Sequence, residues 1–357
     1  MKLHVENAPH PKQRPTDEEL GQTKFGTLFT DRMLIVDYDK ERGWHDGRIV
    51  PYGPLSLDPA TCCFHYGQLI FEGLKAYKTK KGELVMFRPD RNMARMNTSC
   101  ERLCMAPIDE AEMLDAIAQL VRAEEAWVPS APGTSLYIKP FIIGNEVFLG
   151  VHPSGSYIFM TILSPVGAYF KEGLKPVRIY VENDRVRAVK GGTGHTKCAG
   201  NYAASLKSQE EAGAAGYAQV LWLDGVERKH IEEVGGMNIF FVIDGEVVTP
   251  ELNGSILPGV TRASVIDVVK GWGKPVSERK ISIDELADAY KAGRATEAFC
   301  SGTAAVISPI GELKYGDFVM KFNGGKIGET TQRLYDEITG IQTGAIEDKF
   351  GWVYKVK

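Results

Sequence analysis

Short apolar runs and alternating apolar positions predict strands along the first half of the chain. Four segments carry this pattern, and the last two are apolar enough to be buried: residues 33–37, 84–87, 135–143 and 156–163. Two other segments, 91–105 and 109–128, repeat apolar residues at helical spacing, and 109–128 begins with acidic residues that suit a helix N-terminus. Strands and helices are therefore mixed in this half.

The second half shows the same mixture and one strong hairpin signal. Asp244-Gly245 separates two apolar runs, 237–243 and 246–249, as in a two-residue hairpin turn. The other patterns predict strands at 177–182 and 218–223, helices at 200–213, 258–271, 283–292 and 330–339, and a strand, turn and apolar segment at 297–307. The fold class expected from these elements is α/β.

The length of 357 residues favours two domains, because one hydrophobic core seldom grows that large. Residues 164–176 contain proline and turn-forming residues, and they are interpreted as the connection. The predicted division is 1–163, a linker at 164–176, and 177–357. The first fifteen residues are polar and contain proline, so they are expected to be a frayed arm without a secretion signal.

Composition and charge exclude several classes of function. The net charge is −4 and no long basic run occurs, which argues against a nucleic-acid partner. No stretch of about 18 apolar residues is present, so no membrane span is expected. The six cysteines form no CxxC pair and the seven histidines form no HExxH pattern. Neither a disulfide framework nor a metal site is expected, and reduced thiols suit a cytoplasmic protein.

The densest chemical signal is the glycine-rich segment 190–202, which delivers Lys197 to the start of a predicted helix. Both nucleotide-binding motifs fail here, because a P-loop needs glycine where Thr196 stands and a dinucleotide fingerprint needs glycine at Lys197. A lysine amine in a partly enclosed site can instead form a Schiff base. An ordinary loop lysine is the alternative that this segment alone leaves open.

Segment 190–202 resembles the lysine loop of branched-chain aminotransferases, which are fold-type-IV enzymes that use pyridoxal phosphate (PLP). Further blocks match the family in order along the chain: Phe25-Gly26-Thr27, Phe64-His65-Tyr66, Phe71-Glu72-Gly73-Leu74-Lys75-Ala76-Tyr77, Phe87-Arg88-Pro89, Ser135 to Pro140, Glu232 to Phe240, Leu257 to Arg262 and Ser301 to Ala304. One such block would be a weak signal, but eight or more in order are specific.

The resemblance implies roles for three residues around the cofactor ring. Lys197 matches the Schiff-base lysine, which would also carry the proton between the substrate Cα and the cofactor. Glu233 matches the carboxylate that pairs with the pyridine nitrogen and makes the ring a better electron sink. Tyr202 matches the residue that hydrogen-bonds the phenolic oxygen. Taken singly, Glu233 would more often be a surface strand residue and Tyr202 a core tyrosine.

The resemblance also implies residues that bind the cofactor phosphate and the substrate carboxylate. They are an arginine, a further basic residue, a glycine before a helix start, that helix start and a second turn: Arg88, Arg187, Gly259, Val260 with Thr261, and Thr303 with Ala304. Without the lysine and glutamate blocks, the last two segments would be interpreted as simple turns.

The expected substrate pocket consists of aromatic residues that wall an aliphatic side chain: Phe25, Tyr66, Phe71, Tyr137 and Tyr169. Lys139 stands where the family often carries arginine. It lies two residues after Tyr137 in a predicted strand, so both side chains are expected on one face, with Lys139 at the pocket rim. A solvated strand lysine is the alternative. His195 is expected to be an exposed loop residue without a catalytic role.

The implied architecture is the two-domain α/β fold of the D-amino-acid-aminotransferase-like, fold-type-IV enzymes, with a smaller N-terminal and a larger C-terminal domain. The implied enzyme is a homodimer that exchanges the amino group of L-leucine, L-isoleucine or L-valine with 2-oxoglutarate, giving 2-oxo acids and L-glutamate. Two other functions stay open: another fold-type-IV enzyme, such as a D-amino-acid aminotransferase or aminodeoxychorismate lyase, and a scaffold protein without cofactor.

Overall fold

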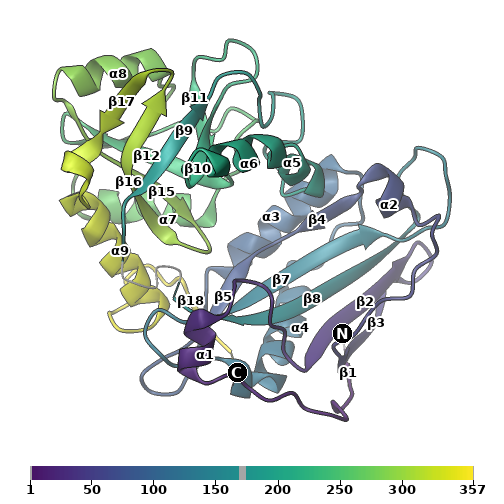
Figure 1. Cartoon of the computed structure of the whole chain (residues 1–357). Helices are drawn as coiled ribbons and strands as arrows, with labels where there is room; N and C mark the ends of the chain where they lie inside the picture. The colour runs from purple at the N-terminus through teal and green to yellow at the C-terminus, as the bar shows by residue number, and fades with distance from the viewer. Residues whose placement is uncertain (1, 169–173, 357) are drawn as a thin grey trace. The chain divides into compact units, whose positions relative to one another are not determined.

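The computed structural model describes residues 2–168 and 174–356 and divides them into two compact units (Figure 1). The first unit is Met1–Lys171 with Thr196–Ala199 and Gly340–Lys357, and the second is Glu172–His195 with Gly200–Thr339. The first change of unit falls inside the predicted linker 164–176. The units differ from the predicted domains in two places, because Thr196–Ala199 and the C-terminal residues join the first unit, which becomes the larger one.

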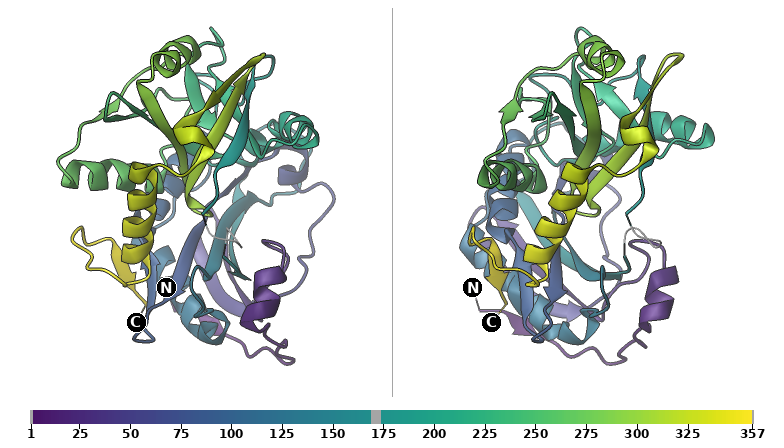
Figure 2. Two further views of the ribbon diagram at one scale, coloured as in Figure 1. Left: turned by 60° about the vertical axis from the view of Figure 1, so that its left-hand side comes forward. Right: turned by 90° about the vertical axis from the view of Figure 1, so that its left-hand side faces the viewer.

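The first unit is built on a nine-stranded sheet with the order β1-β3-β2-β8-β7-β5-β6-β18, and β4 pairs with β7. Its strands are β1 His4–Val5, β2 Arg32–Asp39, β3 Gly43–Pro51, β4 Leu69–Phe71, β5 Leu74–Lys78, β6 Leu84–Phe87, β7 Ser135–Gly144, β8 Ser156–Val166 and β18 Val353–Lys355. Both the N-terminal strand β1 and the C-terminal strand β18 belong to this sheet, in which they form the two opposite ends of the strand order (Figure 2).

The N-terminal arm is ordered, so the prediction of a frayed arm is wrong. Strand β1 pairs in parallel with β3, and Lys12 donates from its backbone N–H to Asp31 at 2.8 Å. Strand β8 also runs to Val166, three residues into the predicted linker. Both differences arise because pairing with a neighbouring strand gives these backbone groups partners that local composition does not reveal.

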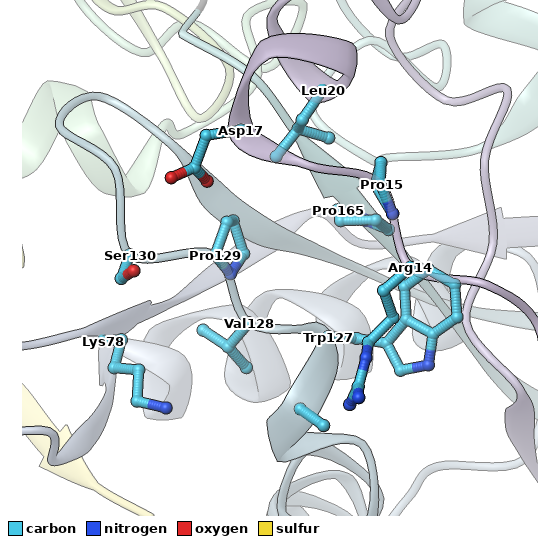
Figure 3. Close-up of a pocket in the computed structure, with 11 residues that line it drawn as sticks. Arg14, Pro15, Asp17, Leu20, Lys78, Trp127, Val128, Pro129, Ser130 and Pro165 are labelled. Carbon is cyan, nitrogen blue, oxygen red and sulfur yellow. The ribbon is translucent and has the colours of Figure 1, made fainter.

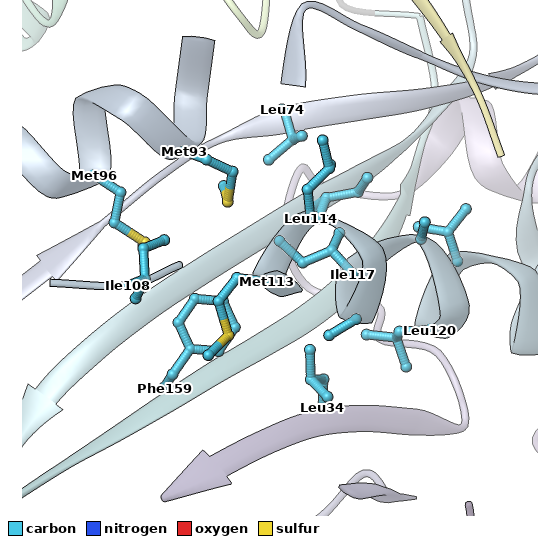
Figure 4. Close-up of a cluster of buried hydrophobic side chains, with 14 of the residues drawn as sticks. Leu34, Leu74, Met93, Met96, Ile108, Met113, Leu114, Ile117, Leu120 and Phe159 are labelled. Atoms are coloured by element: carbon cyan, nitrogen blue, oxygen red, sulfur yellow. The ribbon is translucent and has the colours of Figure 1, made fainter. Parts of the chain in front are cut away.

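Two helices cover one face of this sheet and complete its core. Helix α3 is Pro89–Arg102, which starts with proline at its first turn, and α4 is Glu110–Ala123, whose N-cap Asp109 accepts from the Glu112 N–H. Figure 4 shows side chains of both helices against the sheet: Met93, Met96, Met113, Ile117 and Leu120 beside Leu34, Leu74 and Phe159. Burying each such side chain contributes roughly 1.5–3 kcal/mol. The predicted helices exist but are shorter, since α4 ends before a 3-10 turn at Glu125–Trp127.

Two short helices complete the first unit. Helix α1, Asp17–Gln22, begins at Thr16, which forms a capping box with Glu19. Helix α2, Cys62–Tyr66, ends at Gly67 in the left-handed conformation.

The second unit holds another nine-stranded sheet, with the order β11-β10-β9-β16-β15-β12-β13-β14 and β17 paired with β16. Its strands are β9 Val177–Glu182, β10 Gln219–Leu223, β11 Ile231–Val234, β12 Met237–Ile243, β13 Glu246–Thr249, β14 Val276–Glu278, β15 Ala295–Gly302, β16 Val306–Tyr315 and β17 Phe318–Lys321. The predicted hairpin is confirmed: β12 and β13 pair antiparallel, and Asp244 and Gly245 both have positive φ, 52° and 79°.

The remaining helices are α5 Ala199–Ala203, α6 Leu206–Ala214, α7 Val260–Gly271, α8 Ile283–Lys291 and α9 Glu329–Gln342, with a 3-10 turn at Phe322–Gly325. The single helix predicted over 200–213 is broken before Leu206. The mixed α/β class is confirmed. None of the helices within the described ranges is both long and apolar enough to cross a membrane.

Candidate active site

The predicted site residues divide between the two units. The first unit holds those expected at the substrate and the lysine, together with the arginine expected at the phosphate: Phe25, Tyr66, Phe71, Tyr137, Lys139 and Lys197, and Arg88. The second unit holds those expected around the ring and the phosphate: Arg187, Tyr202, Glu233, Gly259, Val260, Thr261, Thr303 and Ala304. Tyr169 lies outside the described residues.

Lys197 is held by its backbone at both polar groups. Its N–H donates to Ser99 Oγ on α3 at 3.0 Å. Its carbonyl accepts from the Phe71 N–H at the end of β4, also at 3.0 Å. The next residue, Cys198, forms an antiparallel bridge with Ile70. The segment Thr196–Ala199 is thus fixed on the first unit through its backbone.

The ring of Phe71 lies under two amines. Lys139 Nζ is 3.5 Å and Lys197 Nζ is 5.0 Å from the ring centroid. Burial and the nearby charge of Lys197 lower the pKa of Lys139 to about 8, although the carboxylate of Glu72 opposes this shift. Lys139 is only partly exposed and faces this group, so the alternative of a solvated strand lysine is wrong.

Tyr137 belongs to the same face of β7 as Lys139, as predicted, because the two residues are two apart in one strand. Its ring meets that of Phe25 edge to face, with centroids 5.0 Å apart. Gly73 has no room for a side chain, because an added Cβ would overlap the Tyr137 hydroxyl. Tyr66 belongs to a different group, since its hydroxyl donates to the Leu149 carbonyl at 2.5 Å.

Arg88 occupies the position just before helix α3. Its φ of 48° is left-handed, which is uncommon for a non-glycine residue and turns the chain sharply from β6 into the helix. The guanidinium lies 4.7 Å from the ring centroid of Trp352, and the Arg88 N–H donates to the Trp352 carbonyl at 2.8 Å. The C-terminal segment therefore holds Arg88 in place.

In the second unit, Glu233 on β11 is 2% exposed, so the alternative of a surface strand residue is wrong. Arg187 Nε lies 3.2 Å from Glu233 Oε2 at an angle that makes an ion pair and not a hydrogen bond. The same arginine donates to the carbonyls of Gly194 and Ser255, at 3.0 and 2.6 Å. Arg187 thus neutralises Glu233 and links two loop segments through the carbonyls of Gly194 and Ser255.

Asn238 is a site residue that sequence reasoning missed. It is a polar residue inside the apolar run of β12, and this was the one available signal. Its amide donates to the Leu257 carbonyl at 2.9 Å, while the Leu257 N–H donates to Glu233 Oε1 at 2.6 Å. Both polar backbone groups of Leu257 are therefore fixed. An added Cβ at Gly259 would overlap the Asn238 amide oxygen, so this position needs glycine.

The segment after Leu257 leads directly into helix α7. Gly259 is its N-cap residue, and Val260 and Thr261 form its first turn. The first N–H groups of a helix have no intrahelical acceptor, so the start of α7 is suited to an anion.

Thr303 and Ala304 lie in the tight turn between β15 and β16. That turn closes at Val306, whose φ of 61° is a strained value for a β-branched residue. On the preceding strand, Ser301 pairs with Asn238. The strand that leads into this turn and the segment that leads into α7 therefore both contact Asn238 in the second unit.

Tyr202 on α5 is half-buried, and an added Cβ at Gly236 would contact its ring at 3.6 Å. In the glycine-rich segment, a Cβ at Gly194 would overlap the Ser255 carbonyl. His195 is partly buried and its Nδ1 lies 3.1 Å from the Gly254 carbonyl, so the expectation of an exposed loop residue is wrong. The loop packs against segment 253–255, a tertiary contact that sequence spacing did not reveal.

A further pocket in the first unit has none of the predicted site residues among the residues that line it (Figure 3). Two cations, Arg14 and Lys78, share it with the carboxylate of Asp17 and the ring of Trp127. Because both signs of charge line it, this pocket selects no ligand of one charge.

The sequence matches the family described as amino-transferase class IV over residues 69–313. A protein of Bacillus subtilis (strain 168) named branched-chain-amino-acid aminotransferase 2 is 56% identical over 354 residues, which cover 99% of this chain and 97% of that protein. A branched-chain-amino-acid aminotransferase of Mycolicibacterium smegmatis is 46% identical over 342 residues, covering 94% and 93%.

Solved structures show the same likeness. A branched-chain amino acid aminotransferase from Escherichia coli superposes with a TM-score of 0.74 at 28% identity, covering 92% of this chain and 99% of that one. A branched-chain aminotransferase from the archaeon Thermoproteus uzoniensis, solved with norvaline, has a TM-score of 0.74 at 27% identity, covering 91% and 100%. A further enzyme of this kind, solved with pyridoxamine 5′-phosphate, has a TM-score of 0.76 at 29% identity, covering 91% and 98%.

The packing at Gly259 gives a stability prediction. Gly259→Ala forces a Cβ against the Asn238 amide and is expected to lower the free energy of unfolding by about 1–3 kcal/mol. Gly200→Ala is the matched control, because nothing lies within 4 Å of its added Cβ, and it is expected to be neutral or stabilising. Urea unfolding of both variants compares them. Equal stability would show that Gly259 is not constrained by Asn238.

Proposed function

Because this chain belongs to the amino-transferase class IV family and is a PLP-dependent branched-chain-amino-acid aminotransferase of fold type IV, we propose that Lys197, Glu233 and Arg88 are its principal cofactor residues. The chain transfers the amino group of L-leucine, L-isoleucine or L-valine to 2-oxoglutarate. The observation that carries the residue assignment is the buried carboxylate of Glu233, fixed by Leu257 and paired with Arg187.

The residues of the second unit fit the cofactor. When bound, the PLP ring withdraws electrons from the substrate Cα, and this requires a proton on its pyridine nitrogen. Glu233, as a buried anion, would stabilise the protonated nitrogen, and Arg187 would keep Glu233 charged and oriented. Tyr202 would donate to the phenolic oxygen. Around the phosphate, the first turn of α7 with Gly259 and the Thr303 turn would supply N–H groups. Arg88 of the first unit keeps its proposed role as a phosphate-binding arginine.

Lys197 would hold the cofactor through Nζ until the substrate amine displaces it. The freed Nζ would then take the proton from the substrate Cα and deliver it to the C4′ carbon of the cofactor. The backbone contacts to Ser99 and Phe71 support this role, because they fix the point from which the side chain of Lys197 extends.

The substrate side of the site is proposed to contain Phe25, Phe71 and Tyr137, where Phe25 contacts Tyr137 and Phe71 contacts Lys139. The aromatic rings would contact the aliphatic side chain, and the Lys139 ammonium would attract the γ-carboxylate of glutamate and 2-oxoglutarate. Tyr66 and Tyr169 keep their proposed places in the pocket. An activity panel of L- and D-amino acids with 2-oxoglutarate tests the substrate class, and preference for D-amino acids would contradict it.

We further propose a homodimer in the cytoplasm. An exposed apolar patch of the first unit supports the dimer: Phe64 and Tyr66 of α2 with Val147, Leu149 and Val151 of the loop between β7 and β8, from 40% to 85% exposed. Closing the pocket with these residues of a second copy would cover this surface. The six cysteines are free, which suits a reducing compartment. Light scattering tests the stoichiometry, and cell fractionation tests the compartment.

Lys197→Ala is expected to lower turnover by several orders of magnitude, because both the attachment of the cofactor and the proton transfer depend on this amine. Steady-state kinetics with leucine and 2-oxoglutarate measure the loss, and the visible absorbance of the cofactor reports its attachment. Turnover near that of the parent protein would show that Lys197 is not the catalytic lysine.

Glu233→Gln keeps the shape of the side chain but removes its charge. The variant is expected to lose turnover strongly and PLP content only modestly, since the pyridine nitrogen is then no longer held protonated. Cofactor content and turnover per bound cofactor separate the two effects. A variant that loses PLP but keeps its turnover per bound cofactor would show that Glu233 is only structural.

Lys139 predicts a pH dependence that differs between substrates. Burial and Lys197 lower the pKa of Lys139 to about 8 while Glu72 opposes them, so its ammonium is present below that pH and is lost above it. KM for 2-oxoglutarate is therefore expected to rise over about one pH unit either side of the pKa, more than KM for leucine. Arginine stays charged, so Lys139→Arg should flatten this rise, and Lys139→Met should raise KM for glutamate and 2-oxoglutarate at every pH. Parallel profiles for the two substrates would return Lys139 to a structural role.

A further inference from the structure

A second buried carboxylate, Glu72, lies beside the lysine in the first unit and has no part in the roles described so far. Its side chain is completely buried and that of Arg95 is 8% exposed. Arg95 donates from Nε and from one terminal nitrogen to the two oxygens of Glu72, at 2.8 and 2.7 Å. Asn92 donates to the same carboxylate at 2.8 Å, and the Gly73 N–H does so at 3.3 Å. Glu72 is therefore fixed in one orientation.

The partners of Glu72 also carry a contact to Lys197. Asn92, Arg95 and Ser99 follow one another along the buried face of α3, at the spacing that aligns side chains on a helix. Asn92 and Arg95 bind Glu72, and Ser99 accepts the Lys197 N–H at 3.0 Å. On the other side, Phe71 precedes Glu72 and donates its N–H to the Lys197 carbonyl at 3.0 Å.

The ion pair of Glu72 with Arg95 thus joins the two elements that hydrogen-bond the Lys197 backbone. Ser99 on α3 makes one of these backbone contacts, and Phe71 at the end of β4 makes the other. Arg95 also lies on α3 and Glu72 follows Phe71, so their ion pair links the same two elements. The Glu72 N–H donates to the Pro140 carbonyl of β7 at 2.7 Å, which anchors this end to the sheet. Lys139 immediately precedes Pro140 on β7. The same hydrogen bond therefore links Glu72 to the strand that carries the Lys139 amine.

We propose that Glu72 is a positioning residue for Lys197. With Arg95, it sets the spacing of the two elements that hydrogen-bond the Lys197 backbone, α3 and the end of β4. Its fixed carboxylate also stabilises the protonated form of Lys197 Nζ beside the competing cation of Lys139. This deepens the proposed function and rests on the assignment of Lys197 to the cofactor. Lys197 must receive a proton at Nζ when it takes one from the substrate, and a fixed neighbouring anion favours that product.

The electrostatic balance around Glu72 supports the same direction. Burial raises the pKa of Glu72, but the charges of Arg95 and Lys197 outweigh burial and hold it below its ordinary value. The interaction is mutual, so the carboxylate favours the ammonium form of Lys197. Lys139 acts in the opposite sense, because two ammonium groups on one phenylalanine ring repel each other.

A buried ion pair is a costly way to obtain stability alone. Well-packed apolar residues of similar volume often serve as well or better, so a charged pair at this position calls for another role. The contacts of this pair to the neighbours of Lys197 supply one.

The test measures the basicity of Lys197 without the cofactor. In the apoenzyme, the rate at which Lys197 is acetylated by acetic anhydride is followed by mass spectrometry of its peptide as a function of pH, since only the neutral amine reacts. Glu72→Gln is expected to move the midpoint of Lys197 down by about one pH unit, or about tenfold more neutral amine at a given pH. Glu72→Asp keeps the charge and is expected to restore most of the shift.

Two further variants separate this role from a structural one. Glu124→Gln breaks another buried ion pair of the same unit, Arg32 to Glu124 at 3.0 Å, with a carboxylate side chain 1% exposed. It is expected to lower the thermal midpoint and leave the Lys197 midpoint unchanged. Lys139→Met removes the competing cation and is expected to move the Lys197 midpoint up.

If Glu72→Gln does not fold, Ser99→Ala is tested instead. It leaves the ion pair of Glu72 with Arg95 intact and removes the hydrogen bond that the Lys197 N–H donates to Ser99. Hydrogen exchange of the segment Thr196–Ala199 is then expected to rise, and unchanged exchange would overturn the proposal. For a folded Glu72→Gln, a loss of thermal stability like that of Glu124→Gln with an unchanged Lys197 midpoint would overturn it. Full turnover of Lys197→Ala would refute the proposed function instead. The acetylation midpoint of Lys197 does not depend on turnover, so it would still report the effect of Glu72 on this amine.

Discussion

A carboxylate removed from water must be neutralised and hydrogen-bonded, and this constraint organises both units of the chain. In each unit, a buried carboxylate among the candidate site residues or beside Lys197 pairs with an arginine: Glu72 with Arg95, and Glu233 with Arg187. Removing one partner of a buried pair typically costs about 3–5 kcal/mol, because the other charge is left without compensation. The segments that contact these pairs are accordingly fixed: the Lys197 backbone through α3 and β4, and Leu257 before α7.

The two pairs correspond to the two places where the proposed reaction must hold a proton. Glu233 would keep a proton on the ring nitrogen of PLP throughout the cycle, whereas Glu72 would support a proton that Lys197 Nζ carries only in part of it. A carboxylate in direct contact suits the first task. An anion held behind the lysine by Arg95 suits the second, because Nζ must also release its proton to the cofactor. Lys139 adds a cation with a lowered pKa, which in its proposed role would make recognition of a second carboxylate sensitive to pH.

Hydrophobic periodicity predicted the elements whose pattern is local. Strand β7 and the hairpin at Asp244-Gly245 follow directly from alternation and turn chemistry. The break before Leu206 and the pairing of β1 with β3 were missed, because they depend on neighbours distant in sequence. The resemblance supplied the site residues in the same way that it supplied the fold, through matched blocks. Glu72 lay inside such a block, but its partner Arg95 stands among the apolar positions of α3, and only the packing of α3 on the sheet reveals the pair.

The central claim is that Lys197 is the residue that holds the cofactor, and chemical trapping tests it most directly. The holoenzyme is reduced with borohydride and digested, and the peptide that carries the added phosphopyridoxyl mass is identified by mass spectrometry. The account predicts that this mass lies on Lys197 and on no other lysine. Modification of Lys139 or Lys75 in its place, or cofactor that washes away after reduction, would contradict the account.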